Sequence, residues 1–219
     1  MFLITAGFIK ELKEFEKNDD FPNFIIMLLP NDHTSGTRPG MPTPQAAVAD
    51  NDLALGQIVE AISGSKFWNE TCIFVTEDDP QAGLDHVDGH RTVGLIISPY
   101  TKRGKVLSTY YSQINMVRTI ENILGIPPMN QLDLTAAPML DCFINQPDFT
   151  PYKAVKNNIL LDHLNPALSA LTGDQLYWAK KSMEQNLTDV DRIDEDVFSQ
   201  IIWHAVKGYD RPYPTLQKR

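Results

Sequence analysis

Apolar side chains recur with the period of a helix in five stretches of the chain, separated by shorter apolar runs. In the first stretch Phe8, Leu12 and Phe15 share one side of an otherwise Lys/Glu-rich segment. Thr43-Pro44 opens the second with an N-cap followed by proline at the first helical position. The pattern predicts helices over residues 8–17, 44–63, 112–124, 173–186 and 194–207.

Three apolar runs are too short for helices and predict strands. Residues 24–29 are continuously apolar, the pattern of a strand buried on both faces. Further strands are predicted at 72–76 and 93–98. Strands that alternate with helices favour an α/β fold with a parallel sheet. We therefore expect an α/β region over residues 1–150 and a helical C-terminal extension over residues 151–219.

Composition and charge narrow the class of protein. The chain has 219 residues and a net charge of −9, which argues against non-specific nucleic-acid binding. No apolar stretch reaches the roughly 20 residues of a membrane span. The apolar start lacks the basic region of a signal peptide, so the chain as given is expected in the cytoplasm, and a periplasmic or secreted full-length protein stays open. Cys72 lies in an apolar run and is interpreted as a buried free thiol.

Acidic and histidine residues concentrate in the loops that follow two predicted strands. Asp32-His33 follows the run 24–29, Asp78-Asp79 follows 72–76, and the second loop continues to His86 and His90. A helix connects the two strands, so they should be parallel, and both loops should emerge at the same carboxyl edge of the sheet. Imidazole and carboxylate ligands together suit Zn²⁺, Mn²⁺ or Fe. The sequence therefore predicts a divalent-metal site there.

Other interpretations apply to single residues. Asp32 also fits an ordinary turn, and Glu77 is better explained as structural. The helical triplet at 50–52 fits capping or surface solvation, and the isolated His163 and His204 fit structural roles. Arg91, beside His90, fits either a phosphate contact or a structural ion pair.

Residues 72–99, CIFVTEDDPQAGLDHVDGHRTVGLIISP, resemble the phosphoesterase family of the alkaline-phosphatase superfamily, which includes bacterial acid phosphatases and phospholipases C. The family's strand, acidic pair, glycine and Asp-His-Val correspond here to Asp78-Asp79, Gly83 and 85–87. Segments 29–36, 48–56, 98–104 and 118–121 are similar to bacterial alkaline-phosphatase-like proteins. The resemblance implies part of a parallel-sheet alkaline-phosphatase-like sandwich with a C-terminal helical appendage.

The resemblance also implies a function. It makes Asp32, His33, Asp78 and Asp79 metal ligands together with His86 or His90, between which the sequence does not choose. It implies hydrolysis of a phosphorylated small molecule or phospholipid by a Ser/Thr nucleophile upstream of Met1. The incomplete sheet would then be covered by a homodimer or by the missing N-terminal half. The alternative is a catalytically inactive fragment or binding module that retains the fold.

Overall fold

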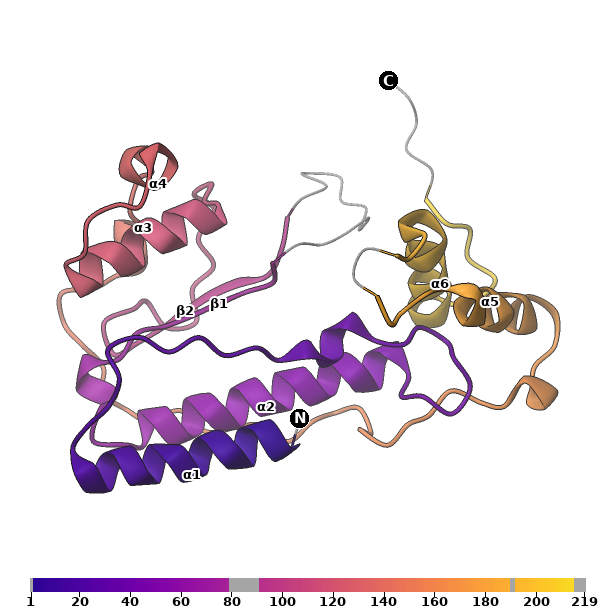
Figure 1. The fold of residues 1–219 in the computed structure, drawn as a ribbon, viewed down its shortest axis with the longest axis horizontal. Coiled ribbons are helices and arrows are strands. Elements are labelled where there is room, and N and C mark those ends of the chain that lie inside the picture. The colour runs from indigo at the N-terminus through magenta and orange to yellow at the C-terminus, as the bar shows by residue number, and fades with distance from the viewer. Residues whose placement is uncertain (1, 79–90, 190–191, 215–219) are drawn as a thin grey trace.

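The computed structural model describes residues 2–78, 91–189 and 192–214, which form a mixed α/β structure dominated by helices (Figure 1). The α-helices are Phe2–Asn18 (α1), Pro44–Ser63 (α2), Gln113–Leu124 (α3), Gln131–Thr135 (α4), Gly173–Glu184 (α5) and Glu195–Lys207 (α6). Short 3-10 helices lie at Pro30–His33 (η1), Trp68–Glu70 (η2), Leu140–Cys142 (η3) and Leu168–Ala170 (η4). The strands are Ile73–Thr76 (β1) and Gly94–Ile97 (β2). None of the described helices has both the length and the apolarity to cross a bilayer.

The predicted helices are confirmed, although α1 begins at Phe2 and not at residue 8, and the two predicted capping residues mark helix ends. Thr43 accepts a hydrogen bond from the Ala46 amide at 3.3 Å at the start of α2. Gly125 ends α3 in the left-handed conformation with φ 68°. The short helix α4 was not predicted, because five residues are too few to show a helical period.

The prediction of a strand at 24–29 is wrong. The segment is extended and runs in the same direction as β1, but no strand forms there (Figure 1). Met27 and Leu29 pack against the core, whereas Phe24, Ile26 and Leu28 are 55%, 82% and 70% exposed. The expectation of burial on both faces is wrong because, among the described residues, nothing covers the outer face of this run.

The sheet in the described part of the chain is antiparallel. β1 pairs with β2, with Ile73 opposite Ile97 and Thr76 opposite Gly94. A parallel sheet was expected, but its parallel partner would have been the run 24–29, which has no strand neighbour. The strands predicted at 72–76 and 93–98 are confirmed; the parallel arrangement is not formed by the described residues.

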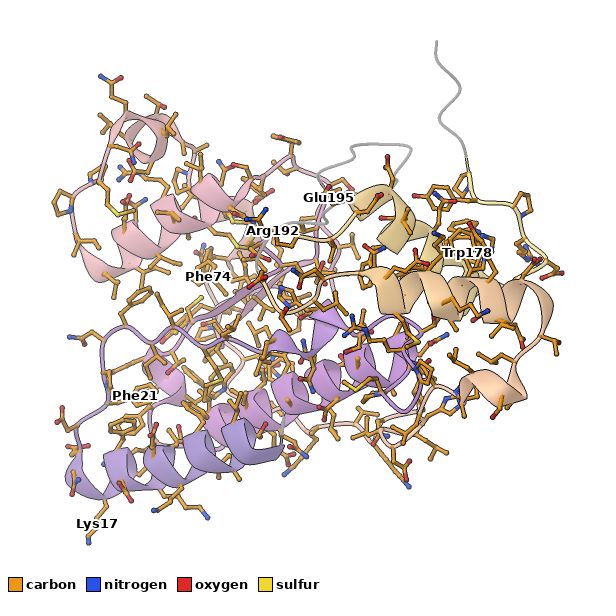
Figure 2. All side chains as sticks on the ribbon, turned by 45° about the vertical axis from the view of Figure 1, so that its right-hand side comes forward. Lys17, Phe21, Phe74, Trp178, Arg192 and Glu195 are labelled. Atoms are coloured by element: carbon orange, nitrogen blue, oxygen red, sulfur yellow. The ribbon has the colours of Figure 1, made fainter. Side chains whose placement is uncertain are left out.

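The main core lies between α1, α2 and η2. Phe8 and Leu12 of α1 pack with Ile58 and Ile62 of α2 and with Trp68 of η2. Phe21, which follows α1, stacks on Phe67 with ring centroids 4.6 Å apart (Figure 2). The amphipathic pattern of the first two helices thus determines which of their faces meet.

The two C-terminal helices pack on each other through aromatic rings. Trp178 of α5 stacks on His204 of α6 with centroids 4.8 Å apart (Figure 2). His204 is buried, which agrees with its interpretation as structural. Cys72 and Cys142 are both free, and burial raises the pKa of the Cys72 thiol to about 12, so this thiol stays protonated at neutral pH.

Asp141 of η3 joins the segment before α3 to the segment after α4. Its carboxylate accepts hydrogen bonds from Thr109, at 2.6 Å, and from the Tyr111 hydroxyl. The bond to Asp141, together with burial, raises the pKa of Tyr111 to about 12. An unfolded tyrosine titrates near 10.

We predict that Tyr111 stabilises the fold up to high pH. Because its folded pKa is raised, its contribution is fully present below about pH 10 and is lost as the pH rises through about 12. Burial also raises the pKa of Tyr209 and Tyr213, so tyrosinate absorbance of the parent should show several late-titrating tyrosines, and Tyr111→Phe should lose the one that titrates near pH 12. In Asp141→Asn the late titration should move toward ordinary values; an unchanged titration would contradict the role of this bond.

Candidate metal and phosphate site

The structure brings the acidic ends of two loops together. The run 24–29 leads into η1, which contains Asp32, and Glu77 and Asp78 directly follow β1. Desolvation, and then the negative charges of Asp32 and Asp78, raise the pKa of Glu77. The negative charges of Asp32 and Asp78 therefore lie close enough to Glu77 to oppose its ionisation.

Asp32 is held at this edge with one oxygen enclosed. Its Oδ1 atom is buried and accepts no hydrogen bond from the described residues, although His33 Nδ1 lies 3.4 Å away. The His33 ring folds back over η1, with Nδ1 3.2 Å from the Pro30 carbonyl oxygen. In the tautomer with the proton on Nδ1, the ring donates to that carbonyl and presents Nε2 as an acceptor.

α2 holds η1 in place through a triplet that was interpreted as capping or solvated. Asn51 Oδ1 accepts a hydrogen bond from the Asn31 amide at 3.1 Å, and its Nδ2 donates to the Leu29 carbonyl at 2.7 Å. The Asn31 side chain donates to Asp50 Oδ2. That interpretation is wrong for Asp50 and Asn51, because Asn51 binds the backbone next to Asp32 and Asp50 binds the Asn31 side chain in the same turn. Their place inside the helix, nearly two turns from its start, gave no signal of partners 19 and 20 residues earlier in the chain.

α3 holds the second loop. The Gln113 side-chain amide donates to the Glu77 carbonyl oxygen at 3.0 Å and to the Asp78 carbonyl oxygen. Sequence reasoning missed Gln113, whose polar side chain at a helix start looks ordinary. It also treated Glu77 as structural, whereas its charge lies beside those of the predicted ligands.

The remaining predicted site residues are only partly placed. Asp79, His86 and His90 lie outside the described residues. Arg91 is described and exposed, two residues before the Val93 that precedes β2. Within the described ranges no group of three or more His, Cys, Asp or Glu side chains is arranged to hold a metal ion. The ligand roles of these residues therefore stay predictions.

Comparison with known families identifies the central part of the chain. Residues 41–127 match the sequence model of the Phosphoesterase family. This match confirms the resemblance seen in residues 72–99 and is consistent with the alkaline-phosphatase superfamily. It spans α2, both strands and α3, but neither Asp32 and His33 nor the C-terminal helices. No curated protein and no solved structure matches the chain.

The backbone is strained directly after the site turn. Thr34 has φ 45° and ψ 165°, a conformation that side chains with a Cβ rarely adopt. Its hydroxyl accepts a hydrogen bond from the Gly36 amide at 3.2 Å. Backbone strain of this kind costs about 1–3 kcal/mol and persists only where the surroundings impose it.

We predict that Thr34→Gly is more stable than Thr34→Ala by about 1 kcal/mol. Both variants lose the hydroxyl, so their difference isolates the strain of the Cβ atom. At an unstrained position the order is reversed, because glycine gains more entropy on unfolding. Urea unfolding of the two variants measures the difference, and greater stability of the alanine variant would contradict the strain at Thr34.

Proposed function

We propose that this chain provides the metal-binding part of a phosphoesterase that hydrolyses a phosphorylated small molecule or a phospholipid. The observation that carries the proposal is that the negative charges of Asp32 and Asp78 act on Glu77, which with Asp78 lies inside the segment 41–127 that matches the Phosphoesterase family. Phosphoester hydrolysis is the chemistry that the family suggests; the metal and the nucleophile are part of the proposal.

The donor types, rather than their arrangement, suit a divalent cation. The enclosed Asp32 oxygen lacks a donor among the described residues, and Glu77 is opposed by neighbouring negative charge. A cation would relieve both, and carboxylate and imidazole together suit zinc, manganese or iron. We propose Asp32, His33 and Asp78 as ligands, with Asp79 and either His86 or His90 from the adjoining segment.

Each group then has a task in hydrolysis. A bound divalent ion supplies Lewis-acid stabilisation of charge on phosphoryl oxygens and lowers the pKa of an attacking hydroxyl. Asn51 and Gln113 keep the two ligand-bearing loops fixed before substrate arrives. Arg91 would contact a phosphate oxygen, and we place the Ser/Thr nucleophile outside residues 1–219.

The proposal extends to the assembly. The exposed side chains of Phe24, Ile26 and Leu28 lie on an extended segment that runs in the direction of β1. A further polypeptide layer on this face would complete a parallel alkaline-phosphatase-like sandwich, supplied by an N-terminal half or by a second copy. Residues 1–150 would belong to this sandwich and residues 151–219 to its helical extension.

Elemental analysis of the purified chain tests the proposal, together with Asp78→Ala and His86→Ala variants and a p-nitrophenyl phosphate assay. We expect near-stoichiometric zinc, manganese or iron in the parent and its loss in both variants. Metal without turnover would support a nucleophile outside the chain. A parent that takes up no metal even from excess would overturn the proposal and favour an inert binding module.

A further inference from the structure

Helix α5 contacts the loop that directly follows the site turn. Ser182 is fully buried; its hydroxyl donates to the Ser35 carbonyl oxygen at 3.2 Å and accepts from the Thr37 amide at 3.0 Å. Between them lies Gly36, with φ 59°, where an added Cβ atom would stand 2.6 Å from Ser182 Oγ. The serine thus binds bare backbone on both sides of a glycine that admits no side chain.

The same loop is held at further points by the C-terminal part of the chain. Thr37 Oγ1 donates to the Trp178 carbonyl oxygen at 3.3 Å, and Arg38 donates to the Gln185 carbonyl oxygen at 2.6 Å. Asn165, also buried, donates to the Gly36 carbonyl oxygen at 2.9 Å. The predicted helical extension, residues 151–219, therefore makes hydrogen bonds to four consecutive residues of the loop, 35–38.

Thr34 lies between two fixed points. On one side Asn31 is bound to α2, and on the other Ser35 is bound to α5. The Thr34 amide donates to the Asn31 carbonyl oxygen at 3.1 Å, so the strained residue closes the site turn. Strain at Thr34 is expected where two rigid supports impose the path between them.

We infer that Ser182 is a positioning residue for the site: it fixes the path of residues 34–37 and through them the turn that carries Asp32 and His33. Its effect on cation binding rests on the proposed function; its effect on the turn does not. The C-terminal helices would then be part of the site's framework, although they lie outside the phosphoesterase segment.

Ser98 offers a matched control. It is also buried, donates through its hydroxyl to the Thr71 carbonyl oxygen at 2.9 Å and accepts from the Tyr100 amide at 3.3 Å. It follows β2, at the opposite end of the antiparallel pair from Glu77. Ser98→Ala therefore removes the same kind of bonds without touching the site turn.

Amide hydrogen exchange at Thr34 and Thr37 tests the inference without metal. Ser182→Ala should speed exchange at both amides at least about tenfold, and Ser98→Ala at neither. Titration with MnCl₂ should show about tenfold weaker binding in Ser182→Ala and unchanged binding in Ser98→Ala. Should Ser182→Ala fail to fold, Arg38→Ala serves instead, because it removes a single contact of the same loop. It should speed exchange at the Thr37 and Thr34 amides by a smaller factor.

The outcomes separate the two proposals. Faster exchange at Thr37 with unchanged exchange at Thr34 would overturn the positioning role, because the loosening would stop before the site turn. A parent that takes up neither Mn²⁺ nor zinc or iron would defeat the proposed function, and the Thr34 amide would still decide whether Ser182 holds the turn. Equal loss of Mn²⁺ affinity in Ser182→Ala and Ser98→Ala would also overturn the inference, since it would reflect general destabilisation.

Discussion

The Asp32→Ala variant is expected to bind Mn²⁺ about a hundredfold more weakly than the parent chain. Asp32 presents a buried oxygen with no hydrogen-bond donor among the described residues, and its charge is close enough to Glu77 to raise the pKa of that carboxyl. Removing it takes away a proposed ligand in a turn that Asn31 anchors to α2. Loss of a direct ligand should cost at least as much as the roughly 10- to 100-fold of a residue that only supports one.

Calorimetric titration with MnCl₂ measures this change. Asp52→Ala is the matched control, because Asp52 is an exposed carboxylate beside Asn51 that makes no contact with η1 among the hydrogen bonds of the described residues. It removes the same charge and should leave the affinity within about twofold, as expected of a screened surface charge. Equal weakening in both variants would mean that net charge, and not a ligand at Asp32, governs binding.

In the absence of metal, Asp32→Ala is expected to raise the free energy of unfolding slightly. The carboxylates of Asp32 and Glu77 repel each other, so removing one relieves the other. Because Glu77 is exposed, solvent screening keeps the gain in unfolding free energy below about 1 kcal/mol. A variant that is no less stable yet binds metal poorly would separate ligation from folding.

Replacing Trp68 with alanine is expected to lower the free energy of unfolding by about 3–5 kcal/mol. Trp68 is 4% exposed and packs with Phe8, Leu12, Ile58 and Ile62. Its ring also meets the edge of Tyr152, with centroids 6.1 Å apart, and so joins the segment after residue 150 to the main core. Deleting the indole leaves a cavity that three elements of fixed position cannot fill.

Urea unfolding followed by circular dichroism measures this loss. Tyr110→Ala is the control, because Tyr110 is an aromatic residue that is 81% exposed, and its removal should change stability by less than about 0.5 kcal/mol. A loss below 1.5 kcal/mol in Trp68→Ala, roughly half the lowest value expected for such a cavity, would show that this cluster is not the main core.

The sequence predicted the local elements well because their causes are local. Thr43-Pro44 and Gly125 mark helix ends through bonds within a few residues, and the structure uses them as expected. The strand prediction for 24–29 was wrong because apolar side chains indicate only that a segment is buried against something. They do not indicate whether a strand within the same chain covers it, and here Ile26 is 82% exposed.

Some residues of the candidate site could likewise be predicted from the sequence, and others could not. The acidic and histidine residues after two apolar runs, and the phosphoesterase pattern around them, are visible in the sequence alone. Asn51, Gln113 and Ser182 are not, because each is a common polar residue whose role depends on a backbone group far along the chain. For Ser182 and Thr37 that distance is 145 residues.

By itself, then, the sequence determined the α-helices other than α4, two of the strands, the resemblance of the central segment to the Phosphoesterase family and the loops that carry candidate ligands. Only the tertiary structure decided that β1 and β2 pair antiparallel, that Glu77 lies beside Asp32, and that α5 holds the loop after His33. The physical reason is that helix propensity and capping act between neighbours in the chain. Charge proximity, backbone strain at Thr34 and hydrogen bonds to distant carbonyl groups exist only once the segments have been packed together.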